Sequence, residues 1–211
     1  MPQFTVIAGP NGAGKSTFST RISRPGALVF DPDLHKKAIE TQFPDISEEA
    51  IEAAVTRKYE SFELNALGGQ KHLTVETNLR NEFLVERAAI FKQAGYLTNL
   101  IFMLLPDVES SMDRVNLRVK QKGHFVDAES IRYNFNKSLE NLMKTVKDFD
   151  QVMLVCAASE YGILSQPELL ATIKGNTVAE LASHIPEWAM PIVQQVIELK
   201  TGYERGNGYK R

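Results

Sequence analysis

The chain of 211 residues has a single cysteine, Cys156, so an internal disulfide framework is excluded. Cys156 lies in the apolar run 152–158, where a small buried side chain is expected rather than a nucleophile. Long apolar runs are also lacking, since the longest, 100–106, has the length of a buried strand. The N-terminal residues do not have the pattern of a signal peptide. These absences predict a cytoplasmic protein without a membrane segment.

A strong excess of one charge is lacking too. There are 24 Lys and Arg residues against 26 Asp and Glu residues, which gives a formal net charge of −2. Without a basic excess, the electrostatics argue against a dedicated nucleic-acid binder. The length favours one α/β domain with an appendage over two independent domains.

Short apolar runs alternate with helical patterns along most of the chain, and helices are expected between successive runs. This alternation predicts an α/β fold in which a five-stranded, mostly parallel sheet is flanked by helices. The runs that predict the strands are 4–8, 27–30, 72–76, 97–105 and 151–157.

The core is expected to span residues 1–158, and two helices at about 107–147 are expected to form a flap on it. The remaining residues, 159–211, have weaker patterns: a short helical segment at 178–183 and a last helix at 191–199. They predict a helical C-terminal extension that packs on the core.

Residues 9–16 match the phosphate-loop pattern G-x-x-x-x-G-K-[ST], directly after the first predicted strand and before a helix. Glycines let backbone N–H groups turn towards phosphate oxygens, and the helix directs its positive dipole to the same place. Lys15 is expected to reach the β- and γ-phosphates, and the Ser16 hydroxyl to ligate Mg²⁺. The sequence thus predicts a P-loop NTPase fold that binds ATP or GTP with Mg²⁺. The predicted nucleotide-binding residues of this segment are Gly9, Pro10, Asn11, Gly12, Ala13, Gly14, Lys15, Ser16 and Thr17.

Acidic side chains follow the second and third predicted strands, where the chemistry of parallel sheets is found. Asp31 and Asp33 come after the second strand, and Glu76 ends the third. Phosphoryl transfer needs a carboxylate to take the proton of the attacking hydroxyl. For Asp33, this role and that of a helix N-cap both remain open.

Basic side chains gather in the flap. Arg114 and Arg118 are spaced i, i+4 and therefore lie on one face of a helix. Arginines of a flap can neutralise the charge of a transferring phosphoryl group and exclude water. A solvated helix face explains the same spacing, so the two interpretations stand side by side.

The order of these motifs resembles that of the zeta-toxin family of small-molecule kinases. The shared features are the phosphate loop, Asp-x-Asp at 31–33, Glu-x-x-x-Arg at 76–80, and an arginine-bearing flap. The flap segments 123–126, 131–132 and 138–142 are similar to those of bacterial relatives, and the resemblance covers about residues 3–157. It implies a kinase that transfers the γ-phosphate of ATP to the 3′-hydroxyl of UDP-N-acetylglucosamine. It also implies a toxin restrained by an antitoxin protein.

The family's functional residues are carried over by position. The resemblance implies that Asp33 is the general base and that Lys15 and Arg118 act on the triphosphate, with Arg132 or His124 as a second contact. The implied substrate-binding residues are Asp33, Glu60, Glu76, Asn78, Arg80 and His124. Asn78 departs from the family pattern, and Tyr133 and Asn134 occupy positions that are often arginine, so the acceptor stays open.

Three classes of function remain: a kinase of a nucleotide sugar or related metabolite, a P-loop ATPase or switch that acts on a protein partner, and a polynucleotide kinase. The net charge of −2 weakens the polynucleotide kinase. Asp33 as a base and the charged flap favour the metabolite kinase over the switch, because a switch needs no base for an acceptor hydroxyl.

Overall fold

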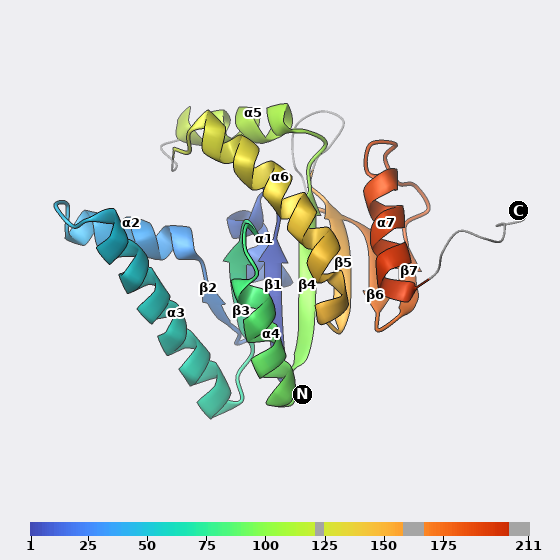
Figure 1. Ribbon diagram of the computed structural model, residues 1–211, viewed down its shortest axis with the longest axis horizontal. Helices are drawn as coiled ribbons and strands as arrows, with labels where there is room; N and C mark the ends of the chain where they lie inside the picture. Colours follow the sequence, from blue (N-terminus) through green and yellow to red (C-terminus); the bar gives the residue numbers. More distant parts are fainter. Residues whose placement is uncertain (121–124, 158–166, 203–211) are drawn as a thin grey trace, which may run out of the picture.

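The computed structural model describes residues 1–120, 125–157 and 167–202, which build a seven-stranded sheet in the order β2-β3-β1-β4-β5-β6-β7 (Figure 1). β1 to β5 are parallel, whereas β6 and β7 are antiparallel to their neighbours. The strands are β1 (Gln3–Ala8), β2 (Leu28–Phe30), β3 (Leu73–Thr77), β4 (Leu97–Leu104), β5 (Gln151–Cys156), β6 (Glu168–Lys174) and β7 (Thr177–Leu181).

Helices cover the sheet on both sides (Figure 1). α3, α4, α6 and α7 lie in front of the sheet in this view, and α1 lies behind it. No helix of the described ranges is long and apolar enough to cross a membrane. The helices are α1 (Lys15–Ile22), α2 (Pro32–Gln42), α3 (Glu48–Gly69), α4 (Phe83–Gln93), α5 (Val108–Lys120), α6 (Ala128–Thr145), the 3₁₀ turn η1 (Val146–Asp148) and α7 (Met190–Thr201).

The central strands are apolar because both of their faces are buried. In β1, Val6 pairs with Val75 of β3 on one side and with Leu100 of β4 on the other. Alternate residues of β1 enter different cores: Val6 packs under the front helices, and Ile7 packs with Phe18 of α1. Such double burial produces the continuous apolar runs by which these strands are predicted.

The α/β class and the P-loop NTPase-like fold are confirmed, but the sheet has seven strands instead of five. β6 joins β5 with Ala171 opposite Leu154, so the sheet continues past the expected core. The segment 178–183, expected to be helical, lies largely in β7, which follows a tight turn at Gly175 (φ 57°). The pair Gly175-Asn176 between two extended segments favours a hairpin over a helix.

The C-terminal extension therefore combines a hairpin with one helix and is not wholly helical. α7 packs on the sheet through Val193 and Val196, which belong to the front core. The expected boundary at residue 158 lies outside the described residues.

Candidate functional site

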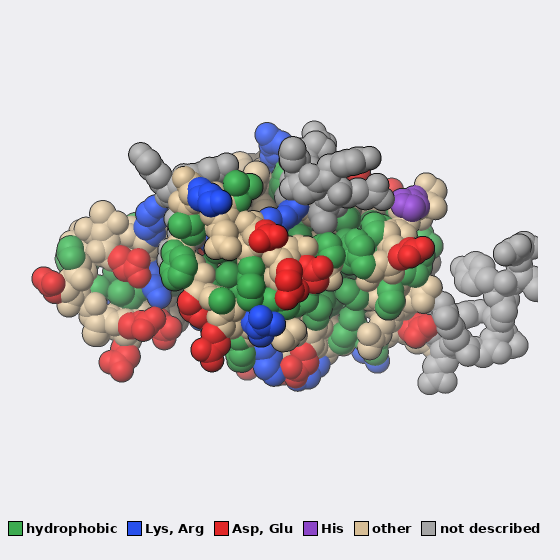
Figure 2. Space-filling model, turned by 90° about the horizontal axis from the view of Figure 1, so that it is seen from above, with side chains coloured by type: hydrophobic (Ala, Val, Ile, Leu, Met, Phe, Trp, Pro, Cys, Tyr) green, Lys and Arg blue, Asp and Glu red, His purple; other side chains and the backbone are tan. Residues whose placement is uncertain are grey.

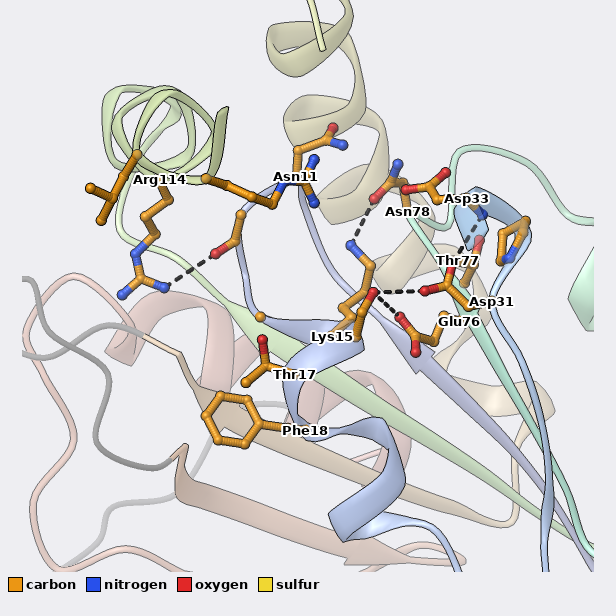
Figure 3. Close-up of a pocket in the computed structure, with 16 residues that line it drawn as sticks. Asn11, Lys15, Thr17, Phe18, Asp31, Asp33, Glu76, Thr77, Asn78 and Arg114 are labelled. Carbon is orange, nitrogen blue, oxygen red and sulfur yellow. Dashed lines mark hydrogen bonds between the residues drawn. The ribbon is translucent and has the colours of Figure 1, made fainter. Parts of the chain in front are cut away.

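The phosphate loop connects β1 to α1 and keeps the conformation that its glycines allow. Gly9, Gly12 and Gly14 all have positive φ values, of 145°, 78° and 87°. A Cβ atom on Gly9 would lie 2.5 Å from the carbonyl oxygen of Met103, so β4 passes too close for any side chain. The loop forms one wall of a pocket of about 420 Å³ (Figure 3).

The pocket lies among the loop, the C-terminal ends of β2 and β3, and α5. Its lining residues are Asn11, Gly12, Gly14, Lys15, Ser16, Thr17, Phe18, Asp31, Pro32, Asp33, Glu76, Thr77, Asn78, Arg114, Leu117 and Arg118. Figure 2, seen from above, shows Lys and Arg side chains mixed with acidic ones on this side of the molecule, while acidic side chains gather at the end formed by α2 and α3.

Lys15 bridges two sides of the pocket. Its Nζ donates hydrogen bonds to the carbonyl oxygens of Gly9 at 2.8 Å and Pro10 at 3.0 Å, and to Oδ1 of Asn78 at 2.7 Å. Burial lowers the pKa of Lys15 to about 8, although Asp33, Glu76 and Asp31 oppose this shift. The lysine is thus a partly desolvated cation with acidic groups around it, which suits it to an anionic ligand.

The hydroxyl of Ser16 faces two carboxylates. Its Oγ lies 2.8 Å from Oδ2 of Asp31 and 2.7 Å from Oε2 of Glu76. One hydroxyl proton cannot satisfy two carboxylate oxygens at once. Burial raises the pKa of Glu76, and the nearby Asp31 charge raises it further, while hydrogen bonds from Ser19 and Ser16 lower it. This concentration of oxygen atoms is suited to a hard divalent cation.

The N-cap of α2 is Asp31, not Asp33. Oδ1 of Asp31 accepts hydrogen bonds from the backbone N–H groups of Asp33 at 2.9 Å and Leu34 at 3.4 Å. Pro32 occupies the first turn, where its missing N–H is not needed. Asp33 stands one residue further along and is exposed, and it lines the pocket near Lys15 (Figure 3). The capping role thus belongs to Asp31.

The flap helices are joined to the phosphate loop by hydrogen bonds. Oγ of Ser111 in α5 donates to the carbonyl oxygen of Asn11 at 2.6 Å, and Arg114 donates to that of Gly12 at 3.2 Å. From α6, Nδ2 of Asn134 donates to Oδ1 of Asn11 at 2.9 Å. Asn134, where relatives of the zeta toxins often have arginine, therefore serves the loop from a buried position.

The predicted site residues separate into two groups. Asp33, Glu76, Asn78 and Arg118 line the pocket together with most of the phosphate loop. Gly9, Pro10 and Ala13 are buried residues of the phosphate loop and do not line the pocket. Glu60, Arg80 and Arg132 are exposed and are also absent from the lining. His124 lies outside the described residues.

Asp31 and Arg114 line the pocket but are not among the site residues that the sequence motifs predicted individually. A signal for Asp31 was present, because an Asp that precedes Pro at the end of a strand is typical of a helix N-cap. Arg114 was noted for its spacing, but its bond to Gly12 depends on how α5 docks, and no local pattern specifies docking.

A family model described as an AAA domain matches residues 4–138 of the chain. The chain belongs to this AAA domain family. The match covers the phosphate loop, the acidic strand ends, α5 and more than half of α6. An uncharacterized protein of Haemophilus influenzae is 27% identical over 127 residues, which are 60% of this chain and 88% of that protein.

Solved structures share the P-loop kinase-like fold of this AAA domain protein. The structure of the PezAT chromosomal toxin-antitoxin system of Streptococcus pneumoniae is similar with a TM-score of 0.62 and 16% identity, covering 94% of this chain and 87% of that one. The structure of AvrRxo1-ORF1:-ORF2 with ATP has a TM-score of 0.66 and 16% identity, covering 99% of this chain and 66% of that one. At these identities the likeness concerns the fold.

Proposed function

We propose that this AAA domain protein is a phosphotransferase that moves the γ-phosphate of ATP or GTP to a hydroxyl group of a small metabolite. The observation that carries the proposal is the position of Asp33. This carboxylate lines the same pocket as the phosphate loop and Lys15, while the neighbouring Asp31 performs the helix-capping role. A P-loop switch has no need of a carboxylate there.

In the proposed reaction, the acceptor hydroxyl gives its proton to the Asp33 carboxylate as its oxygen attacks the γ-phosphorus. The bond between the γ-phosphorus and the β,γ-bridging oxygen breaks, and the nucleoside diphosphate leaves. Lys15 and Arg118, both on the pocket wall, neutralise the charge on the triphosphate. Arg114 holds the carbonyl of Gly12 and so maintains the loop.

The family fold implies Mg²⁺, and the residues present fit it. The carboxylates of Asp31 and Glu76 each lie within hydrogen-bond distance of the Ser16 hydroxyl, so three oxygen-bearing side chains gather there. They would hold the ion directly or through its water ligands, since Mg²⁺ usually keeps several waters. A bound Mg²⁺ would neutralise phosphate charge.

For the acceptor, we propose a nucleotide sugar, with UDP-N-acetylglucosamine as the first compound to test. Support comes from the zeta-toxin-like order of motifs and from the fold shared with the PezAT structure. Glu76 and Asn78 are the acceptor-binding candidates that line the pocket. An antitoxin-like protein is the corresponding proposed partner.

The test is transfer of labelled γ-phosphate from ATP in the presence of Mg²⁺ and a panel of hydroxyl acceptors. Asp33→Ala is expected to reduce transfer about 10²–10⁴-fold, the usual contribution of a general base, while nucleotide affinity stays nearly unchanged. Asp45→Ala, at an exposed residue away from the pocket, is the matched control. Release of free phosphate alone, at equal rates in wild type and Asp33→Ala, would replace the kinase with an ATPase or switch.

A further inference from the structure

α6 carries two buried asparagines whose side chains form hydrogen bonds with residues outside the helix. Asn134 and Asn141 are each 5% exposed, and seven residues, about two helical turns, separate them on one face. Buried side-chain amides require partners, so their hydrogen bonds show what the helix is built to hold. Figure 1 shows α6 running over the front of the sheet from the top of the strands.

The two asparagines hold two different walls of the pocket. Asn134 bonds to the side chain of Asn11 in the phosphate loop at 2.9 Å. Asn141 donates from Nδ2 to the carbonyl oxygen of Leu79 at 2.8 Å, and Leu79 lies in the turn that follows β3. One rigid helix therefore spans from the nucleotide side of the pocket to the side that carries Asn78.

The turn held by Asn141 has an unusual backbone. Leu79 has a φ of 52°, in the left-handed region that a non-glycine residue with a branched side chain avoids. Its side chain is 1% exposed, and its N–H donates to Oγ1 of Thr77 at 2.9 Å. Such a conformation persists only where surrounding interactions stabilise it, and the hydrogen bond from Asn141 stabilises it from outside the turn.

The strained turn determines where Asn78 points. Asn78 lies between Thr77 and Leu79, and its Oδ1 accepts the 2.7 Å hydrogen bond from Lys15 (Figure 3). If Leu79 relaxed to a negative φ, the backbone before it would rotate and carry the Asn78 amide away from the pocket. The hydrogen bond from Asn141 thus connects α6 to the orientation of an acceptor-side group.

We propose that Asn134 and Asn141 are positioning residues, through which α6 fixes the phosphate loop relative to the Asn78 turn. The inference rests on the proposed function, because the two walls are those assigned to the nucleotide and to the acceptor. Asn141 acts through Leu79 and Asn78 on the acceptor, and Asn134 acts through Asn11 on the nucleotide.

The kinetic test uses Asn141→Leu and Asn134→Leu, which keep similar volume and remove the donor. Asn141→Leu is expected to raise the acceptor KM about tenfold, the usual effect of one lost buried hydrogen bond, with little change in the Kd of a fluorescent ATP analogue. Asn134→Leu is expected to raise the Kd of the nucleotide instead. Ser138→Ala is the matched control and should change neither, because Ser138 is buried between them and its hydroxyl donates to the carbonyl oxygen of Phe135 in the same helix.

A double-variant cycle separates positioning from general support of the fold. If Asn141 acts through Asn78, Asn78→Ala combined with Asn141→Leu should have the same acceptor KM as Asn78→Ala alone. If the double variant instead has a loss equal to the sum of the losses in Asn78→Ala and Asn141→Leu, the inference is overturned.

Amide hydrogen exchange tests the positioning without any transfer activity, so that its result does not depend on the proposed function. Asn141→Leu should speed exchange at the Leu79 amide at least about tenfold, as expected for loss of a local hold, and leave the β4 amides unchanged. Asn78→Ala should leave Leu79 protected. Unchanged exchange at Leu79 in Asn141→Leu, or equal acceleration throughout the sheet, would overturn the role of Asn141. Absence of transfer in the wild type would instead contradict the proposed function alone.

Discussion

Oγ of Ser16 lies 2.8 Å from Oδ2 of Asp31, and this contact joins the phosphate loop to the cap of α2. Asp31 uses its two oxygens for two tasks, since Oδ1 caps the helix and Oδ2 faces the hydroxyl. The carboxylate is therefore held in place by the helix that it caps, and its charge is presented to the position proposed for Mg²⁺.

Replacing Asp31 with Asn should separate these two tasks. Asparagine is as good an N-cap as aspartate, so α2 and the free energy of unfolding should change little. Loss of the negative charge should raise the Mg²⁺ concentration for half-maximal transfer about 10–100-fold, as for other partners of metal ligands. A magnesium titration of transfer, with urea unfolding as the control, measures both effects. An unchanged magnesium requirement would remove Asp31 from the proposed site.

The lowered pKa of Lys15 predicts a pH-dependent stability. The pKa is about 8 in the folded protein against the ordinary value of 10.5, so between these values the unfolded state binds more protons. Burying the charged lysine lowers the free energy of unfolding, and this penalty is largest below pH 8. The penalty disappears as the pH rises towards 10.5, because the folded protein loses the proton first. Urea unfolding from pH 7 to pH 10 should show the wild type gaining stability relative to Lys15→Met. A constant difference between the two proteins would contradict the shift.

Two glycines with nearly equal φ allow the fit of the phosphate loop to be tested. Gly12 has a φ of 78° and Gly26 a φ of 77°, but only at Gly12 would a Cβ meet neighbours, at 2.9 Å from Cβ of Arg114 and 3.0 Å from the carbonyl oxygen of Ser111. Gly26→Ala should cost about 1–2 kcal/mol from backbone strain. Gly12→Ala should cost more and should also weaken nucleotide binding, because α5 must move. Equal unfolding free energies for the two variants would show that α5 docks loosely.

The flap arginines should differ in their contribution to transfer. Arg118 lines the pocket, whereas Arg132 is exposed and does not line it. Arg118→Ala is expected to lower kcat at least about a hundredfold. Arginines that stabilise the transition state of phosphoryl transfer contribute about 10³–10⁵-fold. Arg132→Ala serves as the paired variant and should stay near the wild-type rate. A large loss in Arg132→Ala would mean that the flap closes further when the nucleotide binds.

Local sequence patterns predicted the elements that are buried on both faces. The central strands β1, β4 and β5 were visible as apolar runs because both of their faces are covered by helices or neighbouring elements, whereas β2 at the sheet edge was visible as a short apolar run. The phosphate loop was visible because its glycines and lysine are required at fixed spacing by one backbone path. The hairpin of β6 and β7 was missed, since β7 is an exposed edge strand and has little hydrophobic pattern.

The sequence predicted those site residues whose position follows from the strand on which they lie, and not those whose position depends on packing. The grouping of Asp33, Glu76 and Asn78 follows from the rule that parallel strands present their C-terminal ends at one edge. Whether Glu60 and Arg132 reach that edge depends on the rotation of their helices, and for Arg80 it depends on the path of the loop after β3; the structure leaves all three exposed.

The sequence by itself determined the phosphate loop, the α/β class and the acidic residues at the strand ends, because these depend on local spacing. Tertiary structure alone decided that Asp31 faces Ser16, and that Asn134 and Asn141 of α6 hold two walls of one pocket. The physical reason is that these bonds join residues 15, 123 and 62 positions apart. Their partners are selected by the packing of whole helices on the sheet, and no local pattern in the sequence records that packing.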